Sequence, residues 1–175
     1  ERIARRSARG MSRTPSTRRT RRRAYRHRVP PEGGVYARNA ILLDPLTGEV
    51  LFEKNASRSV PIASLSKLMT ALVFLEQNPD LEKEVTARAA EIACAGHTQL
   101  RRGEVVPLGE LLRMSLMCSD NVATRVIAHS SGLEPDEFIA RMNRKSIELG
   151  LTGTRFVEFT GLNEDNVSPR ADVAG

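Results

Sequence analysis

Two side chains three residues apart could form a catalytic pair. Ser64 and Lys67 belong to Ser64-Leu65-Ser66-Lys67, the only S-x-x-K segment in the chain. At the start of a helix, this spacing projects both side chains from one face, about one turn apart. A serine nucleophile needs a base within hydrogen-bond reach, and a neutral lysine amine can be that base. Because lysine has a pKa of about 10.4 in water, burial or a neighbouring cation must lower that pKa.

Histidine is the more usual base for a serine nucleophile, but the three histidines do not fit that role. His27 lies in an arginine-rich segment, and His97 and His129 lie outside any G-x-S-x-G turn or other triad context. We expect all three to be surface or helix-end residues.

A second motif, Ser119-Asp120-Asn121, is the only S-x-N segment in the chain. The Ser119 hydroxyl could pass a proton to a leaving amine, and the Asn121 amide could hold both Lys67 and a substrate carbonyl. The structural alternative is that Ser119 or Asp120 only caps the helix that follows.

The first elements around these residues follow from apolar patterning. Residues 38–55 contain two short apolar runs around a Pro-Leu-Thr-Gly turn, which predicts a β-hairpin. Residues 61–79 predict an apolar helix that ends at Asn78-Pro79 and lies centrally in the core. Its apolar residues are Leu65, Leu68, Met69, Leu72, Val73 and Leu75.

The later elements are mostly helical. Residues 81–106 are mixed, with a charged helical stretch and a turn at Arg102-Gly103. Pro107 opens a second apolar helix, and a third follows the S-x-N motif and ends at Gly132. A fourth, amphipathic helix begins near Glu134. Its apolar side consists of Phe138, Met142 and Leu149, and after it we expect an extended segment at 154–162 and the start of another helix within 163–175.

Charge divides the chain into two regions. Residues 1–34 carry twelve arginines against two glutamates, a net charge of +10, so residues 35–175 carry −4 of the total of +6. Residues 1–34 have almost no aliphatic side chains and cannot bury enough apolar surface to offset the entropy of ordering. We therefore predict a disordered arginine-rich tail over 1–34 and one domain over 35–175.

This division predicts the outcome of limited proteolysis. We expect trypsin to cut rapidly at the arginines of residues 1–34 while the domain resists. Mass spectrometry of the digestion products over time would measure this. A tail that is protected as long as the domain would contradict the prediction and favour a structured binding role.

The two cysteines, Cys94 and Cys118, are not arranged as metal ligands. A disulfide between them is one option, and two buried free thiols are the simpler expectation. We expect no metal and no cofactor. No apolar run reaches the length of a membrane span or of a signal-peptide core, but the chain begins with Glu1 and not with methionine, so this carries little weight against export.

The two motifs and their surroundings resemble a known family. PIASLSKLMTAL followed by LLRMSLMCSDNVATRVIA is similar to the penicillin-binding proteins and serine β-lactamases, whose motif set is S-x-x-K, S-D-N and K-T-G. The resemblance extends to ILLDPLTGEVLFEKN and to LGLTGTRFVEFTGLNEDNVSPRAD, and the latter is similar to the D-alanyl-D-alanine carboxypeptidase and endopeptidase branch. It covers the chain from about Ala37 to its end.

The resemblance implies both a fold and residue roles. The fold is α/β and transpeptidase-like, with an antiparallel sheet, flanking helices and a helical lobe. Ser64 would be the acylated nucleophile, Lys67 its base, Ser119 the proton relay and Asn121 a substrate-binding residue. The Ser64 backbone N–H would form half of the oxyanion hole.

The third motif of the family is not in the sequence. No Lys-Thr-Gly or Lys-Ser-Gly occurs, and Leu151-Thr152-Gly153-Thr154 has leucine where lysine is required and follows Ser119 too closely. In the family this motif lies on a later core strand that binds the substrate carboxylate and supplies the other oxyanion N–H. We therefore expect a domain truncated before its C-terminal strands and close to inactive.

The resemblance also implies partners and location. Peptidoglycan stem peptides would be substrates and β-lactam antibiotics would be ligands, in the bacterial cell envelope. No nucleic acid is expected, because Tyr25 is the only aromatic residue of the tail and no known nucleic-acid fold follows it. The tail could instead contact an anionic envelope surface.

Two alternatives remain at this stage. A class A β-lactamase would need glutamate at position 159 to deacylate the enzyme, but that residue is Phe159, and Glu158 is one residue out of register. The chain could also be a non-catalytic fragment that binds polyanions through its basic tail.

Overall fold

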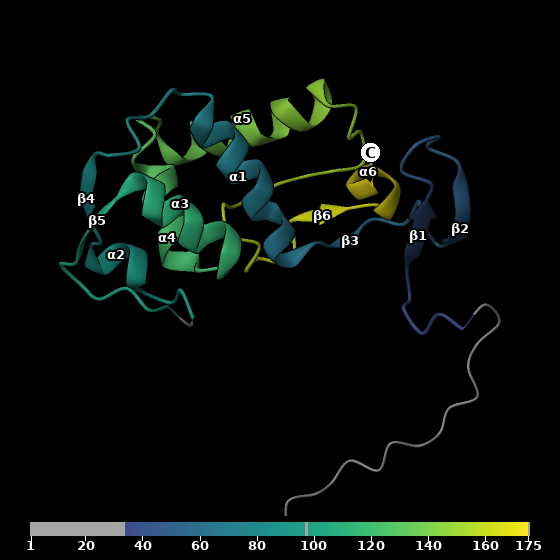
Figure 1. The fold of residues 1–175 in the computed structure, drawn as a ribbon, viewed down its shortest axis with the longest axis horizontal. Helices are drawn as coiled ribbons and strands as arrows, with labels where there is room; N and C mark the ends of the chain where they lie inside the picture. Colours follow the sequence, from purple (N-terminus) through teal and green to yellow (C-terminus); the bar gives the residue numbers. More distant parts are fainter. Residues whose placement is uncertain (1–33, 97, 175) are drawn as a thin grey trace, which may run out of the picture. The chain divides into compact units, whose positions relative to one another are not determined.

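The computed structural model describes residues 34–96 and 98–174. The chain divides into two units, Glu1–Tyr36 and Ala37–Gly175. The predicted disordered tail therefore lies outside the described residues, except for Gly34. The second unit contains all the helices and strands of Figure 1, in the order β1 (Ala40–Leu43), β2 (Val50–Lys54), β3 (Val60–Pro61), η1 (Ala63–Leu65), α1 (Ser66–Leu75), β4 (Glu84–Thr86), α2 (Ala89–Ile92), β5 (Val105–Pro107), α3 (Leu108–Met117), α4 (Asn121–His129), α5 (Pro135–Glu148), β6 (Val167–Ser168) and α6 (Arg170–Ala174).

The predicted β-hairpin is confirmed. β1 and β2 pair antiparallel with Leu42 opposite Phe52, and the register shifts at the next residue. The turn between them is built by Asp44, whose Oδ1 accepts hydrogen bonds from the backbone N–H groups of Leu46 at 2.8 Å and Thr47 at 2.9 Å. Gly48 adopts φ +73°, which glycine tolerates without steric cost. Local turn chemistry therefore sets the hairpin.

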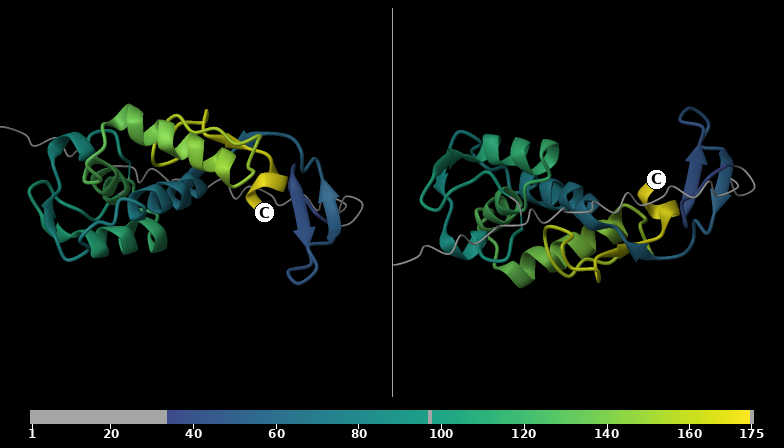
Figure 2. Two further views of the ribbon diagram at one scale, coloured as in Figure 1. Left: turned by 90° about the horizontal axis from the view of Figure 1, so that it is seen from above. Right: turned by 90° about the horizontal axis from the view of Figure 1, so that it is seen from below.

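Helix α1 is central to the domain, as predicted. It contacts α3, α4 and α5, and the two views of Figure 2 show these helices gathered around it. The largest fully buried apolar side chains come from these four helices: Val73, Phe74, Leu108, Leu111, Val122, Ile127, Phe138 and Met142. This core holds α1, whose first turn carries Lys67 and directly follows the turn η1 that carries Ser64.

Only two of the six apolar residues named for the helix predicted over 61–79 pack into the core. Met69 and Val73 are buried, but Leu65, Leu68, Leu72 and Leu75 are 38–61% exposed. These four leucines form one stripe, because their spacing of three or four residues returns to the same face of the helix. The helix is apolar on both faces, so periodicity could not show which face packs. Leu149, expected on the packed side of α5, is also 54% exposed.

The strands after the hairpin are short. β3 pairs with β6, and β4 pairs with β5, both antiparallel. The β4–β5 pair lies in the segment predicted to be partly helical, where only α2 is helical. In the segment predicted to be extended, Arg155 forms a single bridge to Val167. The four later helices are present as predicted. They are α3 after Pro107, α4 after the S-x-N motif, α5 near Glu134 and α6 within 163–175.

Candidate active site

Ser64 and Lys67 are in direct contact. Ser64 lies in the 3₁₀ turn η1 and Lys67 in the first turn of α1, and Lys67 Nζ donates a hydrogen bond to Ser64 Oγ at 3.0 Å. The two side chains therefore meet as their spacing predicts. Their catalytic roles remain predictions.

The Lys67 amine has a second, distant partner. Nζ donates to the backbone carbonyl oxygen of Thr160 at 2.8 Å, and the residue is 2% exposed. Burial lowers the pKa of Lys67 below its ordinary value of 10.5, while the negative charges of Glu158 and Asp120 act in the opposite direction. Because burial is the largest of these influences, the site shifts the equilibrium of this amine towards the neutral form that a base requires.

Ser119 lies in one cleft with Ser64 and Lys67. This cleft has a volume of about 310 Å³, and it is lined by Ser64, Lys67, Ser115 and Ser119, together with Ile62, Leu65, Leu68 and Leu116. Ser119 adopts φ +55°, an uncommon conformation for a residue with a side chain. The structure therefore brings three of the four predicted site residues to one cleft.

Asn121 is placed differently. Its Nδ2 donates to the carbonyl oxygen of Ala95 at 2.8 Å, and it is not among the residues that line the cleft. The predicted contact between the Asn121 amide and Lys67 is therefore not formed. Instead, Asn121 ties the start of α4 to the segment that follows α2.

Asp120, the middle residue of the motif, caps a helix. Its Oδ1 accepts from the backbone N–H groups of Val122 at 2.9 Å and Ala123 at 3.0 Å. Its Oδ2 also accepts from Thr98 Oγ1 at 2.8 Å and from the Gln99 N–H at 3.2 Å. Asp120 thus forms the helix cap considered for this motif, and it anchors both α4 and the 98–99 segment.

This cap predicts a stability effect. We expect Asp120→Ala to lower the free energy of unfolding by roughly 2 kcal/mol, at the upper end for a lost helix cap, because Thr98 and Gln99 also lose their acceptor. Urea denaturation followed by circular dichroism would measure it. Asp165→Ala, at an exposed position, is the matched control and should change stability little. Equal effects of the two substitutions would contradict the role of the cap.

Three residues of the site carry no recognisable sequence signal. Thr160 supplies a carbonyl to Lys67 across 93 positions of sequence. Asn166 is fully buried, and its Nδ2 donates to Ser66 Oγ at 2.9 Å. Glu158 carries a carboxylate that accepts hydrogen bonds from its own loop. Only the resemblance of this segment to the peptidase branch indicated that it belongs near the motifs.

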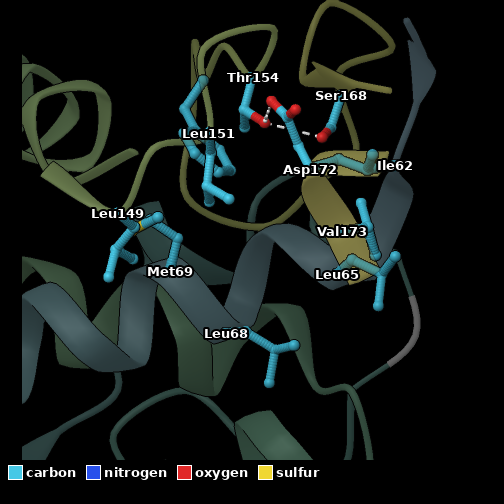
Figure 3. A pocket seen from close by; sticks show the side chains of 11 residues that line it. Ile62, Leu65, Leu68, Met69, Leu149, Leu151, Thr154, Ser168, Asp172 and Val173 are labelled. Carbon is cyan, nitrogen blue, oxygen red and sulfur yellow. Dashed lines mark hydrogen bonds between the residues drawn. The ribbon is translucent and has the colours of Figure 1, made fainter. Parts of the chain in front are cut away.

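A second, apolar groove lies beside the cleft (Figure 3). It has a volume of about 250 Å³, and it shares Ile62, Leu65 and Leu68 with the cleft. At one end, Thr154 Oγ1 bonds to Asp172 Oδ2 at 2.8 Å and to Ser168 Oγ at 2.7 Å. The remaining lining is Met69, Leu149, Leu151, Phe156 and Val173.

The other candidate residues are also placed. Cys94 and Cys118 are free and exposed, so the expectation of buried thiols was wrong. His129 ends α4, as expected, with its ring 5.6 Å from that of Phe159. Within residues 34–96 and 98–174, no group of three or more histidine, cysteine, aspartate or glutamate side chains is arranged to hold a metal ion. None of the helices described there is both long and apolar enough to cross a membrane.

Comparison with protein families decides the affiliation. The model of the D-alanyl-D-alanine carboxypeptidase family matches residues 26–175. The chain belongs to this family. The resemblance inferred from Ser64-x-x-Lys67 and Ser119-Asp120-Asn121 is therefore confirmed.

Curated relatives in the family include both endopeptidases and carboxypeptidases. A D-alanyl-D-alanine endopeptidase of Pseudomonas aeruginosa is 33% identical over 152 residues. The alignment covers 82% of this chain and 49% of the length of the endopeptidase. The D-alanyl-D-alanine carboxypeptidase DacF of Bacillus subtilis is 34% identical over 134 residues, and this alignment covers 74% of this chain and 34% of DacF. The chain thus spans about half the length of the Pseudomonas relative.

Solved structures of the family share the fold. A D-alanyl-D-alanine carboxypeptidase from Mycobacterium tuberculosis superposes with a TM-score of 0.70 at 29% identity, covering 84% of this chain and 58% of that one. A Streptomyces DD-transpeptidase gives 0.73 at 27% identity, covering 80% and 59%. These matches confirm the predicted α/β, transpeptidase-like fold class.

Proposed function

We propose that the chain carries the nucleophile and base of a serine D-Ala-D-Ala peptidase that acts on peptidoglycan peptides. The observation that supports this most is the 3.0 Å contact between Lys67 Nζ and Ser64 Oγ in a site that lowers the pKa of the lysine. The family supports the class of substrate, since the curated relatives are named for D-alanyl-D-alanine.

Acylation would begin with the transfer of the Ser64 hydroxyl proton to the neutral Lys67 amine. As this O–H bond breaks, Ser64 Oγ bonds to the carbonyl carbon between the two D-alanines, and an oxyanion forms. The oxyanion then collapses and the C–N bond breaks. Ser119 would pass its hydroxyl proton to the departing amine of D-alanine and receive in its place the proton held by Lys67, which leaves the lysine neutral again. Water would hydrolyse the resulting ester on Ser64 and restore the hydroxyl.

Two further groups would bind the substrate. The Ser64 backbone N–H would donate to the oxyanion, as one of the two donors that such a site needs. Asn121 would bind the peptide with the groups that its bond to Ala95 leaves unused, the amide oxygen and the second hydrogen of Nδ2.

The same chemistry would accept β-lactams in place of the peptide. A penicillin-binding protein from Listeria monocytogenes, solved in its ampicillin-bound form, matches with a TM-score of 0.64 at 31% identity, covering 78% of this chain and 58% of its own. We expect the Ser64 hydroxyl to open a β-lactam ring and keep the product as an ester. Such a protein would act in the bacterial cell envelope, where the arginine-rich tail could contact anionic polymers.

The absent third motif predicts a difference in rate. We expect the 175-residue chain to release D-alanine from a peptide ending in D-Ala-D-Ala at least about 10²-fold more slowly than a version that extends through a Lys-Thr-Gly strand. The reason is that losing one oxyanion donor costs about 10²–10³ in rate. A coupled assay for free D-alanine would compare the two proteins. Equal turnover would show that these residues need no further strand.

A further inference from the structure

The carboxylate of Glu158 organises the loop that reaches Lys67. Its Oε2 accepts from the backbone N–H of Thr160 and from Thr160 Oγ1, both at 2.7 Å. Its Oε1 accepts from the Gly161 N–H and, at 3.2 Å, from Asn166 Nδ2. All four partners are donors, and the two carboxylate oxygens accept from all of them, which closes residues 158–161 into a bend. An amide has only one oxygen, so it could not accept from all four donors.

The 158–161 bend is attached to α1 through two consecutive carbonyls. The carbonyl oxygen of Phe159 accepts from Thr70 Oγ1 at 2.6 Å, and that of Thr160 accepts from Lys67 Nζ at 2.8 Å. Lys67 and Thr70 are three residues apart, so they present their donors on one face of the helix. The Phe159 ring packs edge-on against Phe138 of α5 at 5.4 Å, which holds the bend from the other side.

The end of the bend lies against the residue before the nucleophile. A side-chain carbon at Gly161 would lie 1.8 Å from the carbonyl oxygen of Ala63, and Gly161 has φ +81°. Only glycine allows this approach. The bend therefore contacts both Ala63, the residue before Ser64, and the Lys67 amine itself.

The contact with Thr160 has a chemical consequence for the amine. A neutral lysine amine has two N–H bonds and one lone pair. A backbone carbonyl only accepts, so it takes one N–H of the amine and restricts the directions left for the lone pair. Because Ser64 Oγ lies 3.0 Å from the same nitrogen, the lone pair can face the hydroxyl proton. After proton transfer, the carbonyl also stabilises the new ammonium.

We propose that Glu158 is a positioning residue for the reaction, acting by closing the 158–161 bend so that the Thr160 carbonyl holds the Lys67 amine against Ser64. This role rests on the proposed function, in which Lys67 is the base. Glu158 does not deacylate the enzyme in this proposal, because its four hydrogen bonds commit both carboxylate oxygens to the bend and to Asn166.

Glu158 could influence Lys67 in two ways that have opposite signs. The ionisable groups that act on Lys67 are Glu158 from the bend and Asp120 at the start of α4, and both raise the pKa of the lysine. If Glu158 acted only through its charge, removing that charge would lower the pKa. If Glu158 holds the bend, removing it admits water to Lys67. Burial is the largest influence on this pKa, so relief of burial would then outweigh the lost charge of Glu158 and the lost Thr160 acceptor, and the pKa would rise towards its ordinary value.

The test is an NMR titration of Lys67 in the chain labelled with carbon-13 and nitrogen-15 lysine, with the signal assigned by its loss in Lys67→Arg. We expect Glu158→Gln to raise the pKa of Lys67. The NH₂ group of the glutamine amide would replace one carboxylate oxygen and face two donors, so the bend would lose those two hydrogen bonds. Glu158→Asp should raise it less, because Asp120 shows that an aspartate can accept from the backbone N–H groups two and three residues ahead. A lowered or unchanged pKa in Glu158→Gln would overturn the proposal.

Two further variants keep the result interpretable. Glu164→Gln removes an exposed carboxylate from the same loop and should leave the pKa of Lys67 unchanged. Thr160→Val removes the hydroxyl, which donates to Glu158 and accepts from the Leu162 N–H at 3.3 Å, and keeps the backbone contacts of Thr160. It should therefore raise the pKa slightly even if Glu158→Gln fails to fold. No shift in Thr160→Val alongside an unfolded Glu158→Gln would count against the proposal. The titration needs no substrate, so a failure of acylation would reject the proposed function and leave this result intact.

Discussion

Ser64→Ala is expected to abolish the covalent adduct that benzylpenicillin forms with the protein. Among the described serines, Ser64 is the one whose hydroxyl receives a hydrogen bond from a lysine amine, and an alanine leaves no oxygen to acylate. Intact-mass spectrometry would detect the adduct in a version that extends through a Lys-Thr-Gly strand. We expect complete loss of the added mass.

The matched control for this experiment is Ser57→Ala. Ser57 is exposed and lies outside the residues that line the cleft, so the adduct should form normally. An adduct that survives in Ser64→Ala would place the nucleophile elsewhere, and Ser119 would be the first residue to test.

Lys67→Arg is expected to slow acylation by about 10²–10⁴-fold, the usual contribution of a general base. Arginine keeps the positive charge and the donors but does not lose its proton, so it cannot accept one from Ser64. Stopped-flow measurement of acylation by a fluorescent penicillin would give the rates. Lys83→Arg, at an exposed position, is the control and should acylate at the native rate.

The same assay tests the protonation state through its pH dependence. If the neutral amine of Lys67 is the base, as proposed, the rate should rise with pH and level off above the pKa of this residue. Burial lowers that pKa below 10.5, so the plateau should begin below the range of an ordinary lysine. Lys67→Arg should lose this rise. A native rate that falls with pH over this range would contradict a lysine base.

The catalytic pair could be predicted from sequence because its geometry is local. Ser64 and Lys67 are held together by one turn of helix, and S-x-x-K specifies that turn. Likewise, the hairpin turn depends on the side chain of Asp44, two and three residues before its partners. Where a contact is made within a few residues, residue type and spacing contain most of the information.

The Thr160 and Asn166 contacts could not be predicted in this way. Thr160 uses its backbone carbonyl, which every residue has, and it meets Lys67 across 93 positions of sequence. Asn166 reaches Ser66 across 100 positions. Residue type therefore gave no signal, and tertiary packing decided both contacts.

The packing of α1 and the orientation of Asn121 show a different limit. Apolar side chains lie on both faces of α1, so apolar periodicity could not separate the face that meets the core from the exposed leucine stripe. Asn121 has a donor and an acceptor that suit a substrate or a backbone carbonyl equally, and here its donor meets Ala95. In both cases the sequence allowed two arrangements.

The left-handed backbone at the cleft links activity to evolutionary constraint. Ala63 and Ser119, beside the nucleophile and at the proposed relay, have φ values of +49° and +55°. For residues with a side chain, such conformations cost on the order of 1 kcal/mol each, and glycine would relieve the cost. Selection for heat resistance alone would therefore favour glycine at both positions. If Ser119 is the relay, selection for catalysis would keep the serine at 119, and this part of the chain would trade thermal tolerance for the placement of a hydroxyl.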